Sequence, residues 1–130
     1  MSPTFLEIED DLALHDLHLR RYGGSAGIRD RGLLESAVAQ ARAGFGGEYL
    51  HADLAAMAAA YLVSIVKNHP FIDGNKRAGL ASALTFLDLN GIAIDHSSAL
   101  LYDTTMAVAE GRLDKDGLAE IYRGLASSKG

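Results

Sequence analysis

The sequence predicts an all-α domain of about six helices, and three observations carry this prediction. Apolar residues recur at spacings of three and four over most of the 130 residues, which is the period of an α-helix. The chain has 14 glycines and two prolines, and many of the glycines fall between the periodic segments, where they end helices. The apolar content of 48% is enough for one modest core. We therefore expect a single domain spanning residues 1–130.

The first three helices are defined by their apolar faces and their end signals. The first is expected from about Glu7 to Tyr22, where consecutive glycines at positions 23 and 24 stop it. Asp30 is placed to cap a second helix, which ends before the glycine-rich stretch 44–47. The third, at about 52–67, is apolar around much of its circumference, so we expect it to be the central helix.

The second half of the chain contains three more helices. The fourth is expected from Asn75 to about Leu89, and Asn90-Gly91 closes it with a left-handed cap. Residues 92–95 are too few for a helix and are compatible with a small strand. Ser97 or Ser98 caps a fifth helix that runs to about residue 110, and Asp114 starts a sixth.

Composition limits the classes of partner and compartment. A net charge of −5 argues against binding of nucleic acid by the whole surface, because that binding needs clustered lysine and arginine. The chain has no cysteine, no apolar run of the roughly 20 residues that cross a bilayer, and acids rather than lysines near its N-terminus. We expect a soluble cytoplasmic protein that binds a protein or a nucleotide and neither nucleic acid nor membrane.

The segment His69–Gly79 is the most informative part of the chain. Gly74 lets the backbone turn sharply, and the amides of Gly74, Asn75, Lys76 and Arg77 then lie in the first turn of the fourth helix, where helices leave amides unpaired. Such amides, the positive end of the helix dipole and the two cations together predict a site for nucleotide phosphate. An ordinary helix start with a solvated Lys-Arg pair is the alternative.

Two other residues of this segment suggest phosphoryl chemistry. His69, at the end of the central helix, is placed to act as a general base toward a serine or threonine hydroxyl. Asp73 is the only carboxylate of the loop, and Mg²⁺ on a nucleotide commonly needs one or two protein carboxylates. As alternatives, His69 is a C-terminal helix histidine favoured by the dipole, and Asp73 is an N-cap, a role compatible with metal binding.

Weaker signals lie outside this segment. His15 and His18 have a spacing that suits metal ligation, but without a third ligand we favour solvated or core histidines. The arginines at 20–21 and 29–31 are expected to be solvated ends rather than phosphate clamps, although the second group lies in a loop that is able to flank the site. The segment Arg42–Tyr49 is a candidate flap over the nucleotide or substrate.

The run HPFIDGNKR at 69–77 resembles the signature of the Fic/Doc superfamily. The lysine after the asparagine is the variant of the death-on-curing toxins of bacterial toxin–antitoxin pairs. The segments LALHDLHLRRYGGSAGIRD at 12–30 and ASALTFLDLNG at 81–91 are also similar to these proteins. The resemblance implies a Fic fold in which the motif loop, between the third and fourth helices, forms the active site.

The same resemblance implies an activity and its residues. Members with this lysine bind ATP with its γ-phosphate at the motif and phosphorylate a threonine of elongation factor Tu, which stops translation. Carried over, His69 is the base, Asp73 the acid associated with Mg²⁺, directly or through water, and Asn75, Lys76 and Arg77 bind phosphate, with Lys76 also counted as catalytic. Fic adenylyltransferases have a glycine at position 76 and a second arginine at position 80, where this chain has Lys76 and Leu80, so transfer of AMP is the second choice.

The resemblance also implies a partner, a Phd-type antitoxin whose C-terminal segment folds onto the toxin and silences it. A hydrophobic groove between helices accepts an amphipathic partner of this kind. We expect the first helix and the loop at 24–31 to form its walls. A third hypothesis is a domain that has lost catalysis and works only by binding an antitoxin-like protein.

Overall fold

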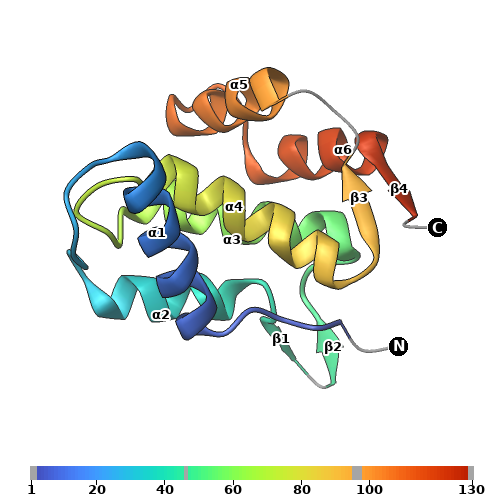
Figure 1. Ribbon diagram of the computed structural model, residues 1–130. Helices are drawn as coiled ribbons and strands as arrows, with labels where there is room; N and C mark the ends of the chain where they lie inside the picture. The colour runs from blue at the N-terminus through green and yellow to red at the C-terminus, as the bar shows by residue number, and fades with distance from the viewer. Residues whose placement is uncertain (1–2, 46, 95–97, 129–130) are drawn as a thin grey trace.

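The computed structural model of the protein describes residues 3–45, 47–94 and 98–128, and in these ranges it contains six α-helices (Figure 1). The expected helical fold is therefore confirmed, with two small two-stranded sheets at its edges. The helices are α1 (Ile8–Tyr22), α2 (Arg31–Gln40), α3 (Leu54–Asn68), α4 (Asn75–Leu89), α5 (Ser98–Ala109) and α6 (Lys115–Leu125). Among the described residues, no helix combines the length and apolar content needed to cross a membrane.

The helices α3 and α4 form the centre of the molecule (Figure 1). Nine residues of α3 are buried, as expected for a central helix, and α2 and α6 both pack on it. Gly79 allows α4 to approach α3 closely, because a Cβ at this position would lie 2.9 Å from Val66 Cγ2 and 3.2 Å from the Leu62 carbonyl oxygen. The motif loop is therefore the short connection between the two most buried helices, which holds it at a defined place.

Most helix ends are where local sequence signals put them. Asp30, Asp53 and Asp114 are the N-caps of α2, α3 and α6, and their side chains accept bonds from the amides of Leu33, Ala56 and Gly117. Gly23 (φ 81°) and Gly91 (φ 80°) have the left-handed backbone that follows α1 and α4. These ends follow from neighbours three to five residues away, which is why the sequence predicts them.

The short segment after α4 is a strand, as expected. β3 (Ile92–Ile94) pairs antiparallel with β4 (Ala126–Ser128), a C-terminal strand that the sequence analysis did not predict. The expected strand end at Asp95 and the candidate cap Ser97 lie outside the described residues. Ser98 is the first residue of α5.

The proposed flap over the substrate is wrong. Its residues form a hairpin of β1 (Gly44–Phe45) and β2 (Glu48–Tyr49) directly before α3, whereas the motif loop follows α3 (Figure 1). Because α3 has 15 residues, it separates the hairpin from the motif loop by about 22 Å at a rise of about 1.5 Å per residue. The hairpin therefore lies far from His69, at the other end of the central helix.

Candidate functional site

His69 ends α3 in a conformation that turns the chain toward the motif loop. It is the C-cap residue, its amide bonds to the Ile65 carbonyl, and its φ of 50° makes it the one described non-glycine residue with a positive φ. Such a backbone costs energy for a residue with a Cβ and is found where the surrounding structure enforces it. The side chain is exposed, so the imidazole is free to meet a substrate.

The loop that follows is fixed by two side chains that point inward. Phe71 is 1% exposed and packs in the smaller of two core clusters, with α2 and α3, so it anchors the loop. The buried Asn75 side chain accepts a bond from the Phe71 amide and donates one to the Phe71 carbonyl, both at 3.0 Å. The Asn75 side chain thus holds the loop, and its main-chain amide is the group left for a ligand.

The helix α4 begins with open amides. Its N-cap is Gly74 (φ 78°), which supplies no side-chain cap, and the Ala78 amide makes the bond to the Gly74 carbonyl. The amides of Asn75, Lys76 and Arg77 belong to the first turn, where a helix offers no internal acceptors. Lys76 is half-buried and Arg77 is exposed. The Gly74 amide, expected as a fourth donor, is not among them, because it donates to the Asp73 carboxylate. The other three amides and the two cations lie together at the start of α4 and stay the candidate anion site.

Asp73 is not the N-cap of α4, the alternative role that the sequence allowed; Gly74 is. One carboxylate oxygen accepts a bond from the adjacent Gly74 amide (2.8 Å) and the other from the Ser25 amide (3.1 Å). These two bonds, the one from Ser25 first, lower the pKa of the Asp73 carboxyl, so the side chain is ionised at neutral pH. An exposed, ionised carboxylate with unused lone pairs fits a Mg²⁺ ion that ATP and water otherwise surround.

The loop between α1 and α2 supports the motif loop from outside. The Ile72 amide bonds to Gly27, and the amides of Arg29 and Asp30 both bond to the Pro70 carbonyl. The Arg29 guanidinium donates to the carbonyls of Asn68 and His69, at 2.6 Å each. Arg29 is exposed, as expected, but its guanidinium also binds the C-terminus of α3 beside the candidate base, a role that the sequence analysis did not predict.

His15 is a core histidine, as expected, and lies behind the motif loop. It is 6% exposed, its ring is stacked on Phe71 at a centroid distance of 3.8 Å, and its Nε2 lies 2.7 Å from the Asp73 carbonyl oxygen. Within the described residues, no group of three or more His, Asp, Glu or Cys side chains is arranged to hold a metal. The pair His15 and His18 is thus not a metal site of that kind.

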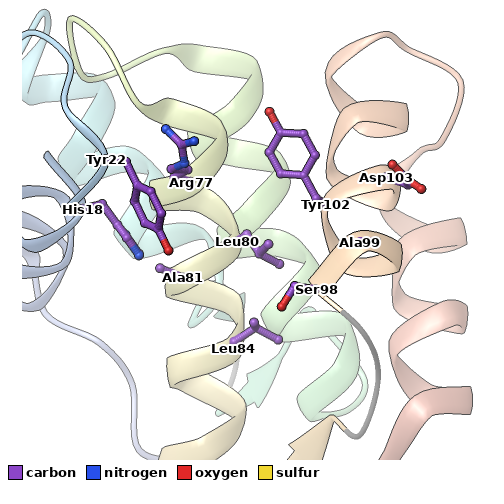
Figure 2. Close-up of a pocket in the computed structure, with 10 residues that line it drawn as sticks. All are labelled: His18, Tyr22, Arg77, Leu80, Ala81, Leu84, Ser98, Ala99, Tyr102 and Asp103. Carbon is purple, nitrogen blue, oxygen red and sulfur yellow. The ribbon is translucent and has the colours of Figure 1, made fainter.

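A groove of about 630 Å³ starts at Arg77 and runs between α1, α4 and α5 (Figure 2). Tyr22 and Tyr102 face each other across it, and Arg77 lies above the Tyr22 ring at 4.4 Å. Burial, followed by the charge of Arg77, lowers the pKa of His18 on the α1 side. The lining residues are His18, Tyr22, Arg77, Leu80, Ala81, Leu84, Ser98, Ala99, Tyr102 and Asp103. α1 forms one wall of this groove and α5 the other. Residues 24–31, which were expected to line an antitoxin groove together with the first helix, do not line this one and hold the motif loop instead.

The fold and the site define a helical domain in which a short loop joins an exposed histidine at the end of one central helix to the open amides at the start of the next. Comparison with known proteins identifies the family. The model of the Fic/DOC family matches residues 5–87. The chain belongs to the Fic/Doc family, as its resemblance implied.

Two relatives match along nearly the whole chain. The chain is 38% identical to "Protein kinase doc" of Escherichia phage P1 over 120 residues, which are 92% of this chain and 94% of that protein. It is 36% identical to "Toxin Doc" of Mycolicibacterium smegmatis over 126 residues, 95% of each protein. The name of the first relative agrees with the expectation of a Doc-type kinase, and that of the second with a toxin.

Proposed function

We propose that this protein is the toxin of a type II, Phd/Doc-like pair and transfers the γ-phosphate of ATP to a threonine or serine of a cytoplasmic protein, elongation factor Tu. The observation that carries the proposal is the exposed imidazole of His69 at the end of α3, which the short motif loop connects to the open amides at the start of α4. A base on one side of the loop and anion-binding donors on the other are the two parts that phosphoryl transfer requires of a protein.

The chemistry assigns a step to each group. His69 takes the proton of the acceptor hydroxyl as its oxygen bonds to the γ-phosphorus, while the bond from that phosphorus to the β,γ-bridging oxygen breaks and ADP leaves. The amides of Asn75 and Lys76, with the charges of Lys76 and Arg77, stabilise the negative charge on the phosphoryl oxygens. Asp73 would hold a Mg²⁺ ion bound with ATP, directly or through water, and the ion would supply neutralisation of phosphate charge.

Lys76 and Leu80 favour a kinase over an adenylyltransferase. Lys76 puts a half-buried cation and a Cβ at the first turn of α4, where the AMP-transferring pattern has a glycine that allows close approach. Leu80 lines the groove with an aliphatic side chain at the position of the second phosphate-binding arginine. Transfer of AMP is the competing function.

The groove is proposed as the docking site of the antitoxin. Its floor of Leu80, Ala81 and Leu84 is apolar, and Arg77 gives one end a positive charge. An amphipathic C-terminal segment with an acidic residue at that end complements both features. Because Arg77 belongs to the groove and to the anion site, an occupant that pairs with Arg77 competes with ATP.

Labelled nucleotide distinguishes the candidate functions. The protein is incubated with Mg²⁺, elongation factor Tu and either γ-labelled or α-labelled ATP. Label on a threonine from γ-labelled ATP alone supports the kinase, and label from α-labelled ATP alone supports AMP transfer. A His69→Ala variant is expected to transfer neither label. If that variant is as toxic in cells as the parent, the binding-only hypothesis holds instead.

A further inference from the structure

His15 connects α1 to the motif loop from the buried side. The ring lies flat on Phe71, with an interplanar angle of 6°, and Nε2 is 2.7 Å from the Asp73 carbonyl oxygen. A carbonyl oxygen only accepts hydrogen bonds, so Nε2 carries the hydrogen and donates it. The contact joins residues 58 positions apart and connects the N-terminal helix to the loop next to the candidate metal acid.

This bond determines which way one peptide group faces. The carbonyl of Asp73 and the amide of Gly74 belong to the same planar trans peptide, so they point in opposite directions. Because His15 holds the oxygen inward, the Gly74 N–H points outward, where it binds the Asp73 carboxylate at 2.8 Å. Gly74, at φ 78°, has no Cβ to oppose rotation of this peptide, so a separate contact is needed to select one orientation.

We propose that His15 is a positioning residue that orients the Asp73–Gly74 peptide, and through it the Asp73 carboxylate. This inference rests on the proposed function, in which Asp73 serves ATP and Mg²⁺. Rotation of the peptide would take the Gly74 N–H away from the carboxylate and leave the bond from Ser25 to hold that side chain. The stacking of the His15 ring on Phe71 fixes where the motif loop lies relative to α1, and the Nε2–H bond fixes the orientation of the Asp73–Gly74 peptide.

Two substitutions separate these contributions. His15→Phe keeps a flat ring against Phe71 and removes the donor, whereas His15→Gln places an amide donor near the position of Nε2 and removes the ring. For His15→Phe we expect kcat to fall by about tenfold to hundredfold, less than the roughly 10²–10³-fold lost with a donor that contacts the oxyanion itself, because His15 acts through Asp73. The Mg²⁺ concentration that gives half-maximal rate rises in His15→Phe and returns toward the parent value in His15→Gln. Asp16→Ala, on the next, exposed position of α1, is the control and is expected to match the parent.

Structure and activity together test the proposal. A crystal structure of His15→Phe is expected to show the Asp73 carbonyl turned away from residue 15 and the Gly74 amide no longer bonded to the carboxylate. If the peptide keeps its orientation, the inference is overturned whether or not the protein is a kinase. It is also overturned if the parent is active and His15→Phe has the same kcat and the same Mg²⁺ dependence as the parent. The same holds if the loss of kcat in His15→Phe and His15→Gln is fully explained by the fraction of each variant that is unfolded. If the parent transfers no phosphate, the proposed function fails and the crystal structure still decides the role of His15.

Discussion

Asp11 makes the stability of this protein depend on pH in an unusual direction. It is a carboxylate on α1 that is 1% exposed and accepts a bond from the Ser82 hydroxyl on α4, and one of its oxygens has no hydrogen-bond partner in the described part of the chain. Burial raises the pKa of Asp11 from 3.8 to about 6, against the bond from Ser82, which lowers it. The folded state therefore binds a proton more tightly than the unfolded chain does.

The sign and size of the effect follow from this pKa. Between pH 4 and 6 the folded protein holds the proton and the unfolded chain releases it, so the free energy of unfolding falls as pH rises. The stabilisation is complete below the unfolded pKa and is lost as pH rises through the folded pKa. A pKa change from 3.8 to about 6 corresponds to about 3 kcal/mol.

Asp11→Asn isolates this contribution, because asparagine has no titrating proton and keeps an acceptor for Ser82. Urea unfolding of parent and variant is measured at intervals from about pH 3 to pH 8, and the variant's unfolding free energy minus the parent's is expected to increase by about 3 kcal/mol over that range. A constant offset from the new amide cancels in this comparison. Ser82→Ala removes the bond that lowers the pKa of Asp11. In this variant the unfolding free energy is therefore expected to fall at a higher pH than in the parent. A difference between Asp11→Asn and parent that does not change with pH would refute the reasoning.

Three further predictions concern the site. Arg29→Ala removes both bonds to the end of α3, so it is expected to misplace His69 and lower kcat by about tenfold, with partial recovery in Arg29→Lys. A kcat in Arg29→Ala equal to that of the parent contradicts this role. Asn75→Ala loses two buried hydrogen bonds and is expected to lower the unfolding free energy by about 2 kcal/mol in chemical denaturation, whereas an unchanged value would mean that the loop holds without them. Lys76→Ala is expected to weaken binding of Mg²⁺-ATP by about tenfold in calorimetric titration, with Lys115→Ala on α6 as the control. If Lys76→Ala binds Mg²⁺-ATP as tightly as the parent, Lys76 does not bind phosphate.

Local signals allowed much of the fold and of the site to be predicted. The caps Asp30 and Asp114, both named from the sequence, act on amides three residues away, and His69 and Gly74 belong to one short loop. For such features, sequence spacing fixes most of the spatial relation. The two ends of α4 were predicted for the same reason.

The supporting residues were not predictable in this way. Arg29 bonds to a carbonyl 40 residues away, His15 to one 58 residues away, and Asp11 to a hydroxyl 71 residues away. Their roles depend on how α1 packs against α4 and on where the loop before α2 lies, and no local spacing encodes this. Asp11 in particular has the sequence pattern of a solvated acid, because it directly follows two other acids, Glu9 and Asp10, in the first turn of α1.

The flap hypothesis failed for a reason that the sequence contained. Glycine-rich composition indicates a turn but not its place relative to the site. The 15-residue helix α3 connects the hairpin to the motif loop, and a rigid helix of that length keeps its two ends about 22 Å apart. Helix length was the information needed to separate the two segments.

The central claim is that His69 and the start of α4 hold the γ-phosphate of ATP between them. A crystal structure of the protein with Mg²⁺ and a non-hydrolysable ATP analogue tests it directly. The terminal phosphorus is expected next to the His69 imidazole, with phosphate oxygens on the amides of Asn75 and Lys76. An α-phosphate at that position, or a nucleotide bound elsewhere with the amides covered by the protein's own side chains, would contradict it.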